Sequence, residues 1–270
     1  MLLRIVIPSL CLAAFSAAPA LSESTLTKPQ LETVVQIDAL TIPTPGEFFV
    51  AMDKQGQPNW TQLFKPETPS ATASREQMAL MLGVLVADGY IAVEAQDGQG
   101  VKNTGKDIIN LAKKLNVSQS ILGRGNSIND FASNNDWSAL REELEATQNE
   151  VKLAMAEQKD QDLVILVSLG AWIRGTDVAT MFISGNYSPE LAELVRQPAI
   201  VSYLLDQVSK LPEKVHSDPL ILKLASGLES VRQLVTTDVD VPLPPDSVNA
   251  LAETMRSMVH AIAEGTKQES

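Results

Sequence analysis

Cysteine is nearly absent from the 270-residue sequence, since its single cysteine, Cys11, lies in an apolar stretch near the N-terminus. A basic start, an apolar run over residues 5–15 and the small-residue pattern Ala18-Pro19-Ala20 predict a secretory signal sequence. We expect cleavage after Ala20, with cleavage after Ser22 as the alternative. The remaining chain would have no thiol, which excludes disulfide bonds, thiol nucleophiles and thiolate metal sites.

The apolar run is about eleven residues long, whereas a membrane-spanning helix needs about twenty. We therefore expect an exported protein with no membrane span in its mature chain; an uncleaved anchor or a buried first helix is the alternative. A mature chain without disulfides suits a periplasm, and secretion is the alternative location.

Basic and aromatic residues are also scarce. The chain has 21 Lys and Arg against 33 Asp and Glu, for a net charge of −12, and only 4% aromatic residues. Nucleic acids and anionic membranes attract clusters of Lys and Arg, so we expect neither as a partner. Few aromatic residues argue against surfaces that stack sugars or bases.

Histidine occurs only as His216 and His260, and the two form no H-x-x-x-H pattern of a zinc protease. No G-x-S-x-G sequence supports a serine hydrolase. We predict no catalytic residue set, no metal site and no cofactor.

Helix signals recur along the chain, while strand signals are weak. Capping boxes at Thr44–Glu47 and Ser74–Gln77 open predicted helices. The segments 78–95 and 162–184 are apolar on nearly every face, which is typical of buried helices. The sequence therefore predicts an all-α fold of about eight helices in a mostly antiparallel bundle around two apolar central helices.

The expected organisation is a cleaved signal over 1–20, an N-terminal arm with a short helix over 21–73, and a helical domain over 74–270. Within the arm, residues 58–73 are predicted to be loop-like. Amphipathic helices are predicted over 106–116 and 138–159, and a helix over 188–210 that kinks at Pro198.

A polar, glycine-rich segment over 97–105 is predicted to be a loop. From Gly100 it fits the phosphate-loop pattern G-x4-G-K, except that Asp107 stands where Ser or Thr would hold magnesium. From Asp97 it starts like a calcium loop, but Lys102 stands where glycine is required. We interpret the segment as an ordinary connection between helices.

Charged residues inside the two apolar segments are the candidates for a site. A buried charge is costly unless it is paired, so we expect Arg174 to pair with Asp177 and to reach Asp88 if the central helices pack together. The favoured interpretation is a structural ion-pair network. The alternative is a polar ligand pocket, with Arg174 as an anion anchor and an aromatic wall. The candidate ligand-binding residues are Asp88, Tyr90, Glu94, Trp172, Arg174 and Asp177.

The segment 85–89 resembles 166–170 at an offset of 81 residues, which suggests either a degenerate duplication or, as we favour, chance similarity. Glutamates 142, 143, 145 and 150 form the solvated face of a predicted helix, with an acidic partner-binding surface as the alternative.

These absences favour a non-catalytic exported protein that binds a protein partner, self-associates or acts as a scaffold. The alternatives are a small-molecule-binding protein with a pocket between the central helices, and a carboxylate-dependent hydrolase.

Overall fold

The computed structural model describes residues 42, 44–68, 70, 73–117, 123–236 and 240–265. They belong to one of the chain's two units, residues 37–270; the other unit, 1–36, and the predicted signal sequence in it lie outside the described residues. Every regular element within the described ranges is an α-helix, which confirms the predicted all-α fold class.

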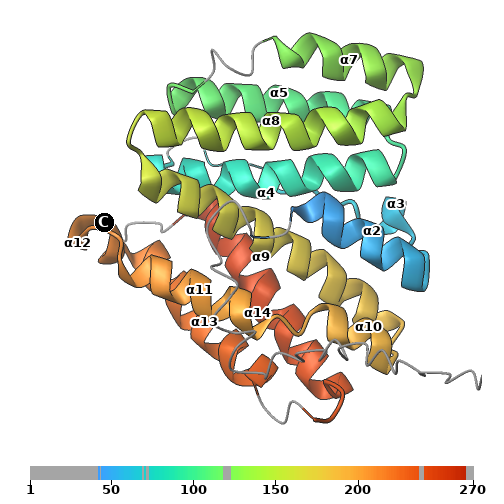
Figure 1. The fold of residues 1–270 in the computed structure, drawn as a ribbon, viewed down its shortest axis with the longest axis vertical. Coiled ribbons are helices and arrows are strands. Elements are labelled where there is room, and N and C mark those ends of the chain that lie inside the picture. The colour runs from blue at the N-terminus through green and yellow to red at the C-terminus, as the bar shows by residue number, and fades with distance from the viewer. Residues whose placement is uncertain are drawn as a thin grey trace, which may run out of the picture. The chain divides into compact units, whose positions relative to one another are not determined.

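Two central helices organise the fold, α4 (Arg75–Glu94) and α9 (Gln161–Gly185) (Figure 1). Their mutual contact is the most extensive between any two described helices. Nearly every side chain of both is buried, which explains why their sequences are apolar on all faces.

Glycines let the backbones of α4 and α9 touch. A Cβ on Gly83 would lie 2.0 Å from the carbonyl oxygen of Val167, and a Cβ on Gly170 would lie 2.0 Å from that of Leu80. No side chain fits at either position without moving a helix. The 81-residue offset would instead make Gly89 the equivalent of Gly170. A Cβ on Gly89 would meet Leu144 of α8 (Trp137–Glu157), so these two glycines do not have equivalent contacts.

The first half of the fold is a ring of four helices. Helix α4 contacts α5 (Gly98–Lys114), α5 contacts α7 (Arg124–Asn134), and α7 contacts α8 (Trp137–Glu157). Helix α8 then returns to α4 and closes the ring, which occupies the upper part of Figure 1. Helices α5, α7 and α8 each bury an apolar stripe toward their neighbours.

The second half repeats this arrangement around α9. Helix α9 contacts α11 (Pro198–Ser209), which packs on α13 (Pro219–Thr236), and α13 packs on α14 (Pro245–Glu264). Helix α14 returns to α9. The two rings meet at the α4–α9 contact. The closing helix of each ring also contacts the central helix of the other, α8 touching α9 and α14 touching α4.

Short helices raise the count above the eight that the sequence predicts. Helix α2 (Pro45–Gly56) begins at the predicted capping box and packs on α4 and α9. Helix α3 (Trp60–Leu63) lies in the stretch predicted as loop, and α12 (Glu213–His216) precedes α13. The helix predicted over 188–210 is two helices, α10 (Pro189–Leu194) and α11, because Pro198 starts a new helix.

The prediction of a loop over 97–105 is wrong, since α5 already begins at Gly98. Asp97 caps this helix by accepting a hydrogen bond from the Gly100 backbone N–H at 2.8 Å. Gly100 packs so closely that a Cβ there would lie 2.7 Å from Phe64. Gly100 therefore serves helix packing, and the partial phosphate-loop pattern lies within a helix.

Helices α4 and α9 are long and apolar enough to span a membrane by composition alone. In this fold 89% and 100% of their apolar windows are buried inside the protein. This burial is what a core helix of a helical bundle requires.

Candidate functional site

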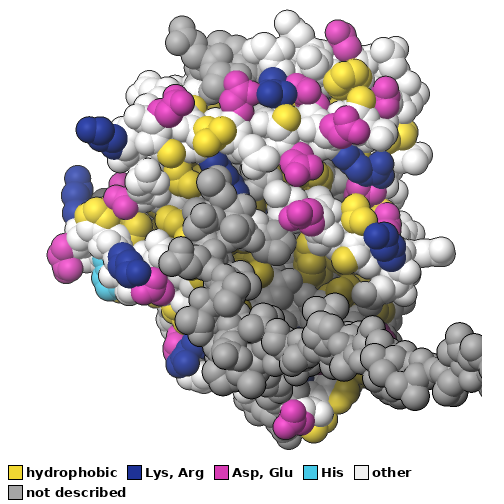
Figure 2. Space-filling model, viewed as in Figure 1, with side chains coloured by type: hydrophobic (Ala, Val, Ile, Leu, Met, Phe, Trp, Pro, Cys, Tyr) yellow, Lys and Arg dark blue, Asp and Glu magenta, His cyan; other side chains and the backbone are white. Residues whose placement is uncertain are grey.

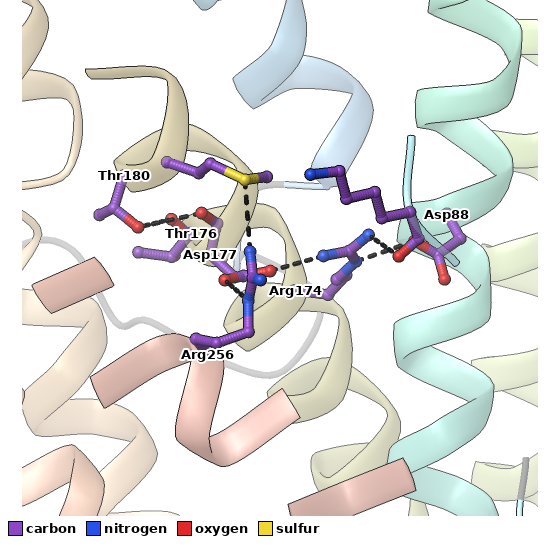
Figure 3. A network of polar contacts seen from close by, with 8 residues as sticks. Asp88, Arg174, Thr176, Asp177, Thr180 and Arg256 are labelled. Carbon is purple, nitrogen blue, oxygen red and sulfur yellow. Dashed lines mark hydrogen bonds and ion pairs between the residues drawn. The ribbon is translucent and has the colours of Figure 1, made fainter. Parts of the chain in front are cut away.

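Three of the four predicted charged residues, Asp88, Arg174 and Asp177, meet between the central helices (Figure 3). Arg174 donates from Nε to Asp88 Oδ1 at 2.8 Å and from Nη1 to Asp177 Oδ2 at 2.5 Å. Both pairs were expected from the sequence, the second because the residues lie one helical turn apart. Arg174 Nη2 also donates to the Lys65 carbonyl at 2.9 Å, which ties the segment after α3 to the site.

A second arginine completes this network, which we call the central network: Asp88, Arg174, Asp177 and Arg256. Arg256 of α14 donates from Nε to Asp177 Oδ1 at 3.0 Å and from Nη2 to Met181 Sδ at 3.3 Å. Asp177 thus bridges two arginines, and the four charges sum to zero. The sequence analysis missed Arg256, because nothing in α14 alone indicates which helix it faces.

Burial sets the electrostatics of the central network. The side chains of Arg174, Asp88 and Asp177 are 2%, 0% and 1% exposed, whereas Arg256 is 48% exposed. Burial raises the pKa of Asp88 to about 6, against the opposing effect of Arg174. Burial lowers the pKa of Arg174, but the two aspartates outweigh this and raise it above its ordinary value, so the guanidinium stays charged.

One oxygen of the central network lacks a full partner. Asp88 Oδ2 is buried and has no hydrogen bond to the described residues, although the backbone of Glu67 lies near enough to lower the Asp88 pKa. Inside the same helix, Thr180 Oγ1 donates to the Thr176 carbonyl at 2.8 Å and to that of Asp177 at 3.0 Å.

Two other predicted site residues lie away from the central network. Glu94, at the end of α4, forms a two-pronged ion pair with Arg141 of α8 at 2.5 and 2.7 Å. Trp172 donates from Nε1 to Gln197 Oε1 at 2.8 Å, which connects α9 to the residues before α11. The first contact joins α4 to α8, and the second joins α9 to the residue before α11.

Tyr90 is the third residue outside the central network. Its hydroxyl is buried and has no hydrogen-bond partner among the described residues. Its ring lies against α2, where a Cβ on Gly46 would approach Tyr90 Cε1 to 2.6 Å. Burial, with smaller contributions from Glu145 and Glu47, raises the pKa of Tyr90 above its ordinary value.

Most hollows in the described part of the protein lie away from the predicted site residues. The void that Trp172 lines, together with Phe48 and Gln197, measures about 10 Å³, roughly the space of one water molecule. A hollow of about 520 Å³ lies between α5 and α7, and one of about 440 Å³ lies beside α2, α3 and α9. Lys65 and Met181, which contact the central network, line the second.

The four glutamates of the predicted solvated face of α8 divide into two groups. Glu143 and Glu150 bind Arg124 of α7, with 3.2 Å between Arg124 Nη1 and Glu143 Oε1. These two therefore join helices rather than form a free solvated face. Glu142 and Glu145 are exposed. Figure 2 shows acidic side chains spread over this side of the protein, with hydrophobic ones in small separate groups.

Potential metal ligands are dispersed in the described residues. No group of three or more His, Cys, Asp or Glu side chains there is arranged to hold a metal ion. Glu213 and His216 form an E-x-x-H pair on α12 that the sequence analysis overlooked, but a di-iron site needs two such pairs. His260 lies 3.3 Å from Glu264 near the end of α14.

Comparison of the chain with protein-family models, with curated proteins and with solved structures found no match.

Proposed function

We propose that this chain is a non-catalytic helical protein that binds a protein partner through its surface. The observation that carries the proposal is the central network, whose charged groups neutralise one another inside the protein. Asp88 and Asp177 both bind Arg174, and none of the three is more than 2% exposed. These groups tie α4 to α9, and Arg256 adds α14 to the same contact. The charged groups of the central network therefore hold these helices together.

The geometry favours this proposal over a small-molecule pocket between the central helices. Pockets for small ligands typically measure about 300–1,000 Å³, whereas the void beside Trp172 measures about 10 Å³. The hollow of about 440 Å³ that Lys65 and Met181 line lies beside α2, α3 and α9, and none of the six candidate ligand-binding residues lines it. An anion anchor must also be free to bind its anion, and Arg174 already binds two carboxylates and a carbonyl oxygen.

A carboxylate-dependent hydrolase receives less support for a related reason. A catalytic acid or base must come within hydrogen-bond reach of its substrate. Asp88 and Asp177 are the carboxylates of the central network, and each is buried against an arginine. Solvent and substrate would reach them only through a rearrangement of α4 and α9.

We propose that the protein is exported and acts in the periplasm or, alternatively, in the medium outside the cell. The N-terminal pattern that ends at Ala20 supports this proposal. N-terminal sequencing of the protein from its own source tests it, with a first residue after Ala20 or Ser22 as the expected result.

Native mass spectrometry of the protein purified gently from its own source tests the proposed function. We expect a species in which the chain is joined to a second protein or to further copies of itself. A bare monomer at micromolar concentration would contradict the proposal. A monomer that retains one small molecule would overturn it in favour of the ligand-binding alternative.

A further inference from the structure

The hollow of about 520 Å³ between α5 and α7 is a groove lined by positive charge. In Figure 1 these helices lie side by side. Three lysines line the groove, Lys102, Lys106 and Lys113, and no carboxylate stands among its described lining residues. The whole chain carries a net charge of −12, so this groove is a basic site on an acidic protein.

The lysines form a row along one side of the groove. They occupy positions i, i+4 and i+11 of α5, which places them on one face of the helix. At 1.5 Å per residue the row is about 16 Å long, the length of roughly five extended residues. Lys106 and Lys113 are exposed and Lys102 is half-buried, so their ammonium groups are accessible to a partner.

The remaining lining of the groove suits a peptide. Ile109 and Ile128 supply apolar surface at its floor, and the amides of Asn103, Asn110 and Asn129 supply hydrogen-bond donors and acceptors. Gly105 and Gly125, which lack side chains, also line it. A polypeptide offers matching groups, namely carboxylates for the lysines, backbone amides for the asparagines and apolar side chains for the isoleucines.

Neighbouring charges leave this basic character in place. Arg124, at the start of α7, is engaged by Glu143 and Glu150 on the α8 side of the helix. Asp107 is absent from the lining of the groove and lines a neighbouring hollow on α5, together with Glu67 and Asp97. Glu143 and Glu150 are therefore paired with Arg124, and the lining of the groove itself carries lysines without carboxylates.

We propose that the α5–α7 groove binds an acidic, partly apolar peptide segment of a partner protein. This proposal rests on the proposed function and names its binding site and the chemistry of its partner. Charge complementarity selects acidic side chains, while the apolar floor and the amides select a peptide over a free anion. Nucleic acid fits less well, because three lysines cannot offset the repulsion of a polyanion by the rest of the chain.

A selection from a random twelve-residue peptide library on the purified full chain tests the proposal. We expect recovered peptides to be enriched in Asp and Glu interspersed with apolar residues. Their binding should weaken at least tenfold in the variant Lys102→Glu/Lys106→Glu/Lys113→Glu, since each exposed ion pair contributes up to about fivefold and charge reversal adds repulsion. The matched control Lys54→Glu/Lys114→Glu/Lys214→Glu changes the net charge equally at exposed lysines outside the groove, and should bind as the wild type does.

Recovered peptides without acidic enrichment, or equal losses in both triple variants, would overturn the proposal. Displacement of the peptides by millimolar inorganic phosphate, or tighter binding of a single-stranded oligonucleotide, would reassign the groove to a free anion or to nucleic acid. Native mass spectrometry separates this failure from that of the proposed function. If the groove variant retains the wild-type assembly, only the groove is wrong; if the wild type shows no assembly, the proposed function fails.

Discussion

Replacing Gly170 by alanine tests the contact on which the fold is built. The new Cβ would lie 2.0 Å from the Leu80 carbonyl oxygen, whereas ordinary contact begins at 3.4 Å. Because the obstacle is backbone, α4 and α9 must separate by roughly 1.4 Å or tilt, across a tightly packed core. Overpacking costs typically up to about 3 kcal/mol, and alanine returns about 1 kcal/mol of helix propensity. We expect a net loss of about 2 kcal/mol.

The same helix provides the control. Gly175 is also buried in α9, but the nearest atom to a Cβ there is Phe48 Cδ1 at 3.9 Å. Gly175→Ala should therefore stabilise the protein, by up to about 1 kcal/mol. The two substitutions are chemically identical and are expected to have opposite signs. Urea unfolding followed by circular dichroism at 222 nm measures both free energies.

A double variant sharpens the test. Gly83→Ala meets the backbone of Val167 as closely as Gly170→Ala meets that of Leu80. One separation of the helices relieves both clashes, so the double variant should lose clearly less than the sum of the two single losses. If Gly170→Ala proves as stable as Gly175→Ala, or if the two losses add, the backbone contact between α4 and α9 is wrong.

Three further predictions concern the buried polar groups. The pKa of Asp88 is raised to about 6 from 3.8, so the folded protein binds this proton more tightly than the unfolded chain. The stability that this tighter proton binding contributes is fully present below about pH 4. It is lost as the pH rises to about 6, which lowers the free energy of unfolding by about 3 kcal/mol. Urea unfolding from pH 4 to 7 should show this fall in the wild type relative to Asp88→Asn, and parallel profiles would contradict it. Arg174→Ala leaves two buried carboxylates without their shared partner and should cost about 3–5 kcal/mol at pH 7 in the same assay; a loss below 1 kcal/mol would refute a structural role. Tyr90→Phe removes a buried hydroxyl without a described partner, so thermal unfolding should find it neutral or stabilised by about 1 kcal/mol, and a marked loss would reveal a hydrogen bond.

Local signals determined the helices and their burial. The capping box at Thr44 starts α2, and Ser74 caps α4, because these hydrogen bonds form between residues three apart. The all-round apolar sequences of α4 and α9 predicted two central helices, since only a buried helix tolerates such a surface. The pairing of Arg174 with Asp177 followed from their spacing, and that with Asp88 followed once the two apolar helices were packed together.

Only the tertiary structure decided which helix faces meet. Arg256 joins the central network from a helix 79 residues beyond Asp177, and Glu94 meets Arg141 rather than a ligand. The glycines of 97–105 suggested a loop because the residues they face, such as Phe64 at Gly100, are distant in sequence. The α5–α7 groove likewise exists because two separate segments pack side by side. The sequence of a helix determines which of its faces are apolar, polar or charged. Which faces then pack together depends on the free-energy cost of desolvating charged groups and of fitting the backbones closely.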